Sequence, residues 1–175
     1  MLLRPAEPDD VLAVARVHVR SWQAGYRELL PGDYLAGLRP EERAQRYDFS
    51  SLDPRAPATI VAVEAGLICG FVTIAAARAA SAPDVGELCA LYVDPERWGR
   101  GIGAALVSAA RARLVDLGFR NAVLWLLAGN ARAERFYRQD RWEPDGAQRR
   151  AAVWGVTVDE LRYRRALQDA TDGPR

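Results

Sequence analysis

Lysine is absent from this 175-residue chain, and all 24 of its basic residues other than histidine are arginines. The absence excludes a phosphate-binding P-loop, which requires a lysine, as well as a Schiff-base lysine and a serine–lysine catalytic pair. Histidine occurs once and cysteine twice, without CxxC or HxxxH spacing, so we expect no metal site. Cys69 and Cys89 both lie in apolar runs, which predicts two buried thiols and no disulfide.

Long hydrophobic runs and a strong charge imbalance are also missing. The longest uncharged stretch, Ala65 to Ala77, is too short to cross a bilayer as a helix, and the N-terminal MLLRPAEPDD does not resemble a signal peptide. The formal net charge of +1 gives no reason to expect a nucleic acid or an anionic membrane as a partner. The composition, 50% apolar and 27% charged, is that of an ordinary globular protein, which we place in the cytoplasm.

The order of the predicted elements indicates one mixed α/β domain over residues 1–167, with a central sheet and a loose tail at 168–175. Helices are expected at 11–26, in the region 33–47 with an interruption near Arg39–Pro40, at 104–117 and at 131–139. Strands are expected at 58–64, 67–77, 86–93 and 121–127, from Trp142 onward, and at 160–167. Residues 78–85 are predicted to form a loop of small residues.

The segment WGRGIGA, residues 98–104, places three glycines at alternate positions between a predicted strand and a predicted helix. Backbone N–H groups at such a junction, together with the helix dipole, form an anion site. A dinucleotide site fits less well, because the spacing is GxGxG and no acidic residue follows the next strand at Leu127. A tight turn without a ligand is the other alternative. Arg97 and Arg100 flank the turn and could bind phosphates or remain solvated.

Two motifs in this order resemble the GNAT superfamily of N-acetyltransferases. PERWGRGIGAAL, residues 95–106, is similar to the superfamily's pyrophosphate motif Q/R-x-x-G-x-G/A, and NARAERFY, residues 130–137, to its N-x-x-A-x-x-F-Y helix. The strands GELCALYVDP and ELRYRR agree with this arrangement. Trp98 departs from it, since Gln or Arg is usual there, and so does Arg141-Trp142, where Gly-Phe is frequent. The resemblance implies a central, mostly antiparallel twisted sheet flanked by helices.

The resemblance also implies acetyl-coenzyme A as co-substrate and transfer of its acetyl group to a primary amine, by direct attack in a ternary complex. The pantetheine arm would pair with the backbone of the strand before the turn, where an N–H could also stabilise the thioester oxyanion. Asn130 would cap its helix, contact the cofactor, or both. The residues that this resemblance assigns to the cofactor are Leu91, Tyr92, Val93, Trp98, Gly99, Arg100, Gly101, Ile102, Gly103, Ala104 and Asn130.

Catalytic roles come from the same resemblance. Tyr137, the last residue of the second motif, is the candidate general acid for the leaving thiolate, and its alternative is a helix tyrosine that packs beside Phe136. Glu87 is similar to the strand glutamate that deprotonates the amine in some members, and its alternative is a strand-start residue that faces solvent.

Acceptor specificity in this superfamily is usually shaped by the first helices. His18, Trp22 and Tyr26 lie on one face of the predicted helix 11–26, where they would contact the acceptor or belong to the core. The acceptor would be a small-molecule amine or a protein N-terminus, and dimers are common in the superfamily. Two competing functions are a CoA-binding module without activity, which the retained Tyr137 disfavours, and a nucleotide-dependent oxidoreductase, which the missing ribose-binding acid disfavours.

Overall fold

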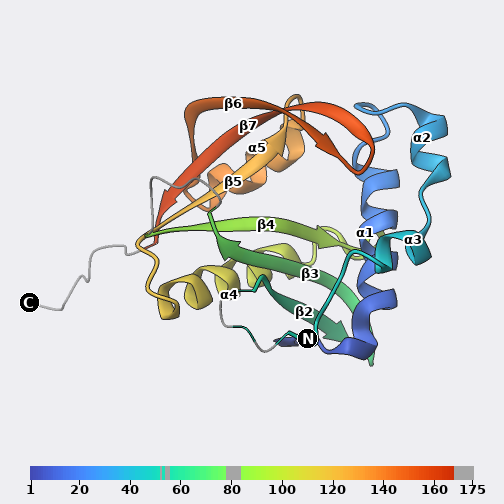
Figure 1. The fold of residues 1–175 in the computed structure, drawn as a ribbon, viewed down its shortest axis with the longest axis horizontal. Helices are drawn as coiled ribbons and strands as arrows, with labels where there is room; N and C mark the ends of the chain where they lie inside the picture. Colours follow the sequence, from blue (N-terminus) through green and yellow to red (C-terminus); the bar gives the residue numbers. More distant parts are fainter. Residues whose placement is uncertain (52, 54–55, 78–83, 168–175) are drawn as a thin grey trace, which may run out of the picture. The chain divides into compact units, whose positions relative to one another are not determined.

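The computed structural model describes residues 1–51, 53, 56–77 and 84–167 (Figure 1). Most of the predicted loop at 78–85 and the whole predicted tail at 168–175 lie outside the described residues. The chain divides into two compact units, residues 1–75 with 89–110 and residues 76–88 with 111–175. Strand β4 (Val85–Val93) and helix α4 (Ile102–Asp116) each contribute to both units.

Seven strands form one sheet in the order β1-β2-β3-β4-β5-β7-β6, flanked by helices, so the predicted mixed α/β fold is confirmed. The sheet is mostly antiparallel, since β1 pairs with β2, β2 with β3, β5 with β7 and β6 with β7 in that direction. Strand β4 runs parallel to β5 (Asn121–Leu127). A parallel pair needs a crossover connection, and α4 lies in that connection.

In the first unit, the predicted helix is found as α1 (Val11–Gly25), which buries one apolar face. Val14 and Val17 pack with Val61 of β2 (Ala58–Glu64) and Phe71 of β3 (Leu67–Ala76). The interrupted helical region is confirmed as α2 (Gly32–Gly37) and α3 (Pro40–Ala44). Strand β1 (Leu2–Pro5) was not predicted, because a four-residue edge strand shows too little alternation to be recognised.

The second unit contains β5, α5 (Ala131–Gln139), β6 (Glu143–Val153) and β7 (Val156–Ala166). Strands β6 and β7 form a long hairpin whose two-residue turn, Trp154-Gly155, has φ values of +53° and +83° (Figure 1). The prediction started the last strand at residue 160, four positions late. Exposed and charged side chains dominate the hairpin, so its apolar pattern is weak.

In the part of the chain that the structure describes, cysteines and other metal-binding side chains do not gather into a site. Cys69 is buried as predicted, but Cys89 is exposed, so that prediction was wrong. The reason is strand alternation, because Cys89 and half-buried Glu87 alternate along β4 with the buried Gly86 and Leu88. Among the residues that the structure describes, no three histidine, cysteine, aspartate or glutamate side chains are placed to hold a metal ion. Within the same ranges, no helix is both long and apolar enough to span a membrane.

Gly70 lets the start of α4 approach the sheet closely. A Cβ at this position would lie 3.1 Å from Leu106 Cδ1, 3.1 Å from the Tyr92 carbonyl oxygen and 3.3 Å from Ile102 Cγ2. These distances are tighter than ordinary van der Waals contact, so a side chain here would displace the helix, the strand or both. The contact holds the first turn of α4, and with it the glycine turn that precedes the helix, against β3 and β4.

Candidate active site

The glycine turn between β4 and α4 has the backbone geometry of an anion site. Gly99 and Gly101 have φ values of +75° and +79°, in the left-handed region that other residues rarely adopt. A Cβ on either glycine would meet nothing within 4 Å, so conformation rather than crowding requires glycine here. The turn is exposed and leads into the 15-residue helix α4 at Ile102, whose first N–H groups favour negative charge. These residues therefore fit the phosphates of a ligand such as CoA.

The two arginines that flank the turn differ in their surroundings. Arg97 Nη1 lies 2.6 Å from Glu64 Oε2 of β2, so this guanidinium already has a counter-ion. Arg100 is exposed, and within the described part of the chain it forms no ion pair. Of the two, Arg100 is the better placed to contact a phosphate on the turn.

The carbonyl of Val93, the last residue of β4, accepts two side-chain hydrogen bonds. Ser21 Oγ of α1 donates to it at 2.9 Å, and Trp98 Nε1 donates to it at 2.7 Å. We call these three residues the Val93 clamp. Trp98, which departs from the usual motif, thus ties the turn to the end of β4 and to α1. Both lone pairs of the Val93 carbonyl are used by these two bonds. If Val93 contacts the cofactor through its backbone, as expected, the contact must therefore be made by its N–H.

The Val93 clamp predicts non-additive losses of stability. Trp98→Phe and Ser21→Ala each leave the carbonyl one donor, so we expect each to lower the free energy of unfolding by about 1 kcal/mol. The double variant leaves a partly buried carbonyl without either donor, and its loss should exceed the sum of the single losses by about 1 kcal/mol. Urea denaturation of the four proteins measures this coupling. Strictly additive losses would contradict a shared acceptor.

An aromatic cluster surrounds His18 of α1 in the first unit. The imidazole stacks on the Tyr92 ring with centroids 4.2 Å apart, and it contacts the rings of Trp22, Tyr47 and Phe71 at 5.8–6.2 Å. Tyr92 is a predicted cofactor residue of β4, so the cluster joins α1 directly to the strand expected to bind pantetheine. We refer to His18, Trp22, Tyr47, Phe71 and Tyr92 as the His18 cluster.

His18 is neutral, and its tautomer follows from its partners. Arg43 Nε donates to His18 Nδ1 at 3.1 Å, and the Tyr47 hydroxyl lies 2.6 Å from the same nitrogen. Since Arg43 can only donate, Nδ1 must accept, which places the imidazole proton on Nε2. Burial and the positive charge of Arg43 hold the His18 pKa well below its usual 6.5. Burial also raises the pKa of Tyr47 to about 12, although Arg43 opposes that rise.

The predicted acceptor residues differ in accessibility. His18 and Trp22 are 2% and 4% exposed, whereas Tyr26, whose ring meets Trp22 edge-on at 5.0 Å, is half-buried. Of the three, Tyr26 therefore has the most exposed surface. Arg43 and Tyr47 were missed by the sequence analysis, because a contact across 25–29 positions leaves no periodic signal along the chain.

Three of the predicted site residues lie in the second unit. Asn130 caps α5 by accepting a hydrogen bond from the Ala133 N–H at 3.1 Å, as its residue type predicts. Tyr137 is 5% exposed and packs edge-on against Phe136 and Trp142. Glu87 is half-buried in β4, opposite Val123 of β5 in the parallel register.

Sequence comparison assigns the chain to a family. The model of the Acetyltransferase (GNAT) family matches residues 20–141, a range that contains the glycine turn and α5. The chain is 31% identical over 128 residues to the uncharacterized N-acetyltransferase YuaI of Bacillus subtilis, covering 73% of this chain and 72% of that protein. It is 37% identical over 91 residues to a mycothiol acetyltransferase of Pseudarthrobacter chlorophenolicus, of which it covers 28%. The chain belongs to the GNAT family of N-acetyltransferases, as its motifs predict.

Solved structures agree with the fold. An N-acetyltransferase from Staphylococcus aureus Mu50 superposes with a TM-score of 0.73 at 19% identity, covering 95% of this chain and 98% of that one. The protein yncA from Salmonella typhimurium, solved with acetyl-CoA, superposes with a TM-score of 0.71 at 17% identity, covering 99% and 97%. An N-acetyltransferase from Thermoplasma acidophilum, solved with coenzyme A, gives 0.67 at 16% identity, covering 94% and 98%.

Proposed function

We propose that this enzyme transfers the acetyl group of acetyl-CoA to a primary amine of a small molecule or of a protein N-terminus, by direct attack within a ternary complex. The observation that carries the proposal is the glycine turn, with two left-handed glycines, an exposed arginine and the start of α4 at one place. The structural relatives that contain CoA or acetyl-CoA support the same co-substrate.

The predicted cofactor residues would bind different parts of acetyl-CoA. The backbone N–H groups from Trp98 to Ala104 would bind the pyrophosphate, with Arg100 adding a charge-assisted contact. The backbone of Leu91, Tyr92 and Val93 would pair with the pantetheine arm. The Val93 carbonyl would not take part, because it accepts hydrogen bonds from Ser21 and Trp98. Asn130, already a helix cap, would contact the cofactor in addition.

The chemistry requires a neutral amine, a stabilised oxyanion and a proton for the leaving thiolate. Glu87 would take the proton from the amine, directly or through water, and Tyr137 would give a proton to the sulfur as the carbon–sulfur bond breaks. A backbone N–H of β4 would stabilise the oxygen of the thioester carbonyl as it gains charge. Tyr26 would contact the acceptor, with His18 and Trp22 shaping the site from behind.

Ligand-dependent stability tests the cofactor half of the proposal. Acetyl-CoA at about a hundred times its Kd should raise the melting temperature by about 5–10 °C, because it binds only the folded protein. Gly101→Val, which cannot hold φ at +79° without strain, should weaken acetyl-CoA binding about tenfold or more. Gly66→Val is the matched control, since Gly66 has φ +77° and equally open space but lies in the β2–β3 turn.

The two glycine variants should lose similar stability, and only Gly101→Val should lose acetyl-CoA affinity. Absence of any stabilisation by acetyl-CoA would refute the co-substrate. Turnover is then measured as thiol release over a panel of small amines and of peptides with an unblocked N-terminus. Clear binding without thiol release on the whole panel would favour a CoA-binding module without activity.

A further inference from the structure

The glycine turn depends for its position on the segments on either side of it. Gly99, Arg100 and Gly101 are exposed, and a Cβ on either glycine would meet nothing within 4 Å. Glycine also has the most flexible backbone of any residue, so the turn gains little rigidity from its own residues. Backbone N–H groups bind an anion better when they already point toward it, because ordering them on binding costs free energy. The neighbouring segments must therefore hold the turn in place.

The segment after the turn is held by apolar packing, whereas the segment before it is held by polar contacts. Helix α4 begins at Ile102, which is buried, and Gly70 lets this end of the helix approach the sheet closely. Residues 94–98, which we call the β4–turn connection, are half-buried or exposed. Hydrogen bonds and ion pairs to the β4–turn connection therefore decide where the turn begins.

Arg20 of α1 holds the β4–turn connection through two carboxylates. Its Nη2 donates to Glu96 Oε1 at 2.8 Å, and its Nε lies 3.3 Å from Asp94 Oδ2. The other carboxylate oxygen of Asp94 accepts a hydrogen bond from the Glu96 N–H at 3.0 Å, which caps the 3₁₀ turn Pro95–Arg97. One guanidinium group thus fixes both the cap of this short turn and a residue within it.

Other side chains hold the same part of the chain at single points. Ser21, the next residue of α1, donates to the Val93 carbonyl, and Arg97 is paired with Glu64 of β2. Arg20 differs from these side chains because it contacts two residues of the β4–turn connection at once. Helix α1, which the sequence leads us to expect at the acceptor, therefore also reaches the segment that leads to the cofactor site.

The exposure of the Arg20 contacts separates an effect on the turn from an effect on the fold. The side chains of Arg20 and Glu96 are 47% and 78% exposed. Ion pairs at such exposed positions add little to the stability of a fold. An exposed turn, in contrast, can shift while the unit around it stays folded. Loss of Arg20 should therefore disturb the glycine turn more than it disturbs the fold.

We propose that Arg20 is a positioning residue for acetyl-CoA. It acts through Asp94 and Glu96, which hold the β4–turn connection, and so keeps the N–H groups of the glycine turn in place for the pyrophosphate. This role rests on the proposed function, because it requires acetyl-CoA to bind at the glycine turn. It extends that function by giving α1 a part in cofactor binding.

Calorimetric titration with CoA measures the effect on binding. Arg20→Gln should raise the Kd of CoA about threefold to tenfold, while the melting temperature falls by less than about 3 °C. Arg20→Lys should weaken binding similarly, because the ammonium group keeps the charge but lacks the planar fork that reaches two carboxylates. In the thiol-release assay, the KM of acetyl-CoA should rise by the same factor, with kcat within about twofold of the original value.

Glu96→Gln separates positioning from simple attraction between charges. If charge alone mattered, loss of a negative charge close to the turn would tighten the binding of an anionic cofactor. Positioning by Arg20 predicts the opposite, a Kd of CoA that rises about twofold to fivefold. The double variant Arg20→Gln/Glu96→Gln should bind CoA no more weakly than Arg20→Gln alone, because both substitutions break the same contact.

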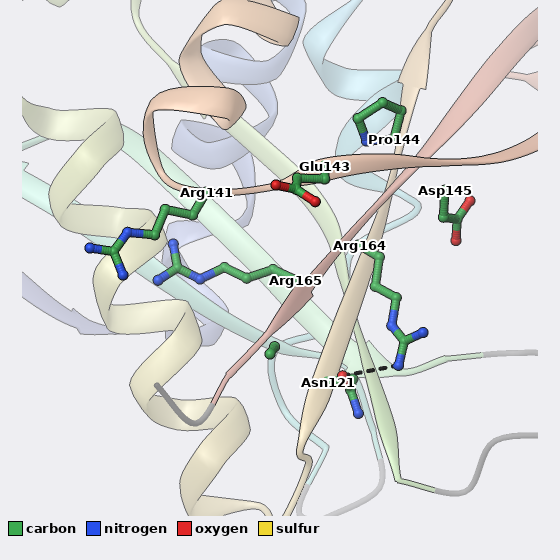
Figure 2. Close-up of a pocket in the computed structure, with 8 residues that line it drawn as sticks. Asn121, Arg141, Glu143, Pro144, Asp145, Arg164 and Arg165 are labelled. Carbon is green, nitrogen blue, oxygen red and sulfur yellow. Dashed lines mark hydrogen bonds between the residues drawn. The ribbon is translucent and has the colours of Figure 1, made fainter. Parts of the chain in front are cut away.

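Arg164→Gln is the matched control for the loss of an exposed arginine. Arg164 belongs to β7 in the second unit, where it lines a pocket together with Arg141 and Arg165 and donates to Asn121 Oδ1 at 3.1 Å (Figure 2). The substitution removes the same charge as Arg20→Gln, and a contact between two elements, from the unit that does not contain the glycine turn. The Kd of CoA should stay within about twofold of the original value.

The outcomes distinguish this role from its alternatives. Weaker CoA binding in both Arg20 variants and in Glu96→Gln, with Arg164→Gln unchanged, supports it. Original affinity in Arg20→Gln or Arg20→Lys, tighter binding in Glu96→Gln, an equal loss in Arg164→Gln, or a loss of kcat in place of a rise in KM overturns it. If the original protein binds no CoA, the proposed function fails together with this role. If the original protein binds CoA and the Arg20 variants bind it equally well, only this role fails.

Discussion

Tyr137→Phe is expected to lower kcat about a hundredfold or more while the Kd of acetyl-CoA changes less than about threefold. The substitution removes only the hydroxyl, and the ring keeps its edge-on packing against Phe136 and Trp142. A general acid acts in the transition state, so its loss slows the departure of the thiolate more than it weakens binding of the ground state. Single-turnover kinetics with acetyl-CoA bound beforehand separate the two effects.

Tyr163→Phe is the matched control for this prediction. Tyr163 is a buried tyrosine of the same unit, and its hydroxyl donates to Glu134 Oε2 at 3.0 Å. Its loss should lower the free energy of unfolding by about 1–2 kcal/mol with little change in kcat. If both variants turned over at the original rate, Tyr137 would not be the acid, and its place in α5 would reflect packing.

His18 is expected to make the protein less stable at mildly acidic pH. Its pKa is well below 6.5 in the folded state and returns to about 6.5 on unfolding. Below pH 6.5 the unfolded chain therefore binds a proton that the folded chain does not, so the free energy of unfolding falls as pH falls. The unfolded-state pKa of about 6.5 limits this loss to about 2 kcal/mol between pH 7 and pH 5.

Assignment of this pH effect is direct because the chain contains one histidine. Of the groups that face His18, Tyr47 does not titrate in this range, because its pKa is raised to about 12. His18→Asn keeps an acceptor near the position of Nδ1 and removes the titrating ring. Urea denaturation from pH 7 to pH 5 should show a shallower pH dependence for this variant, even though its stability is lower throughout. Equal slopes for the two proteins would rule out His18 as the cause.

Local sequence patterns predicted most of the helices, strands and turns of the fold. The helical spacing of residues 11–26 predicts the apolar face of α1, and the run 121–127 is found as strand β5 with the predicted bounds. Glycine spacing at 99, 101 and 103 predicts the turn. Gly99 and Gly101 have the left-handed φ values of such a turn, whereas Gly103 belongs to the first turn of α4. These features could be predicted because each depends on residues within a few positions of one another. The weakly patterned elements, β1 and the β6–β7 hairpin, were missed or shortened for the same reason.

By itself, the sequence determined the family, the glycine turn and the residue types expected to bind phosphate and carry acetyl transfer, because these are properties of short motifs. Only the tertiary structure decided the partners of individual side chains. In the structure, the Trp98 indole donates a hydrogen bond to the Val93 carbonyl, Arg97 forms an ion pair with Glu64, and Arg43 donates to a buried neutral histidine. It also exposed Cys89 and placed Arg141 and Arg165 in one pocket. These pairings join residues that are close in space through the sheet and its helices, and their energies depend on burial and local charge, which no spacing along the chain encodes.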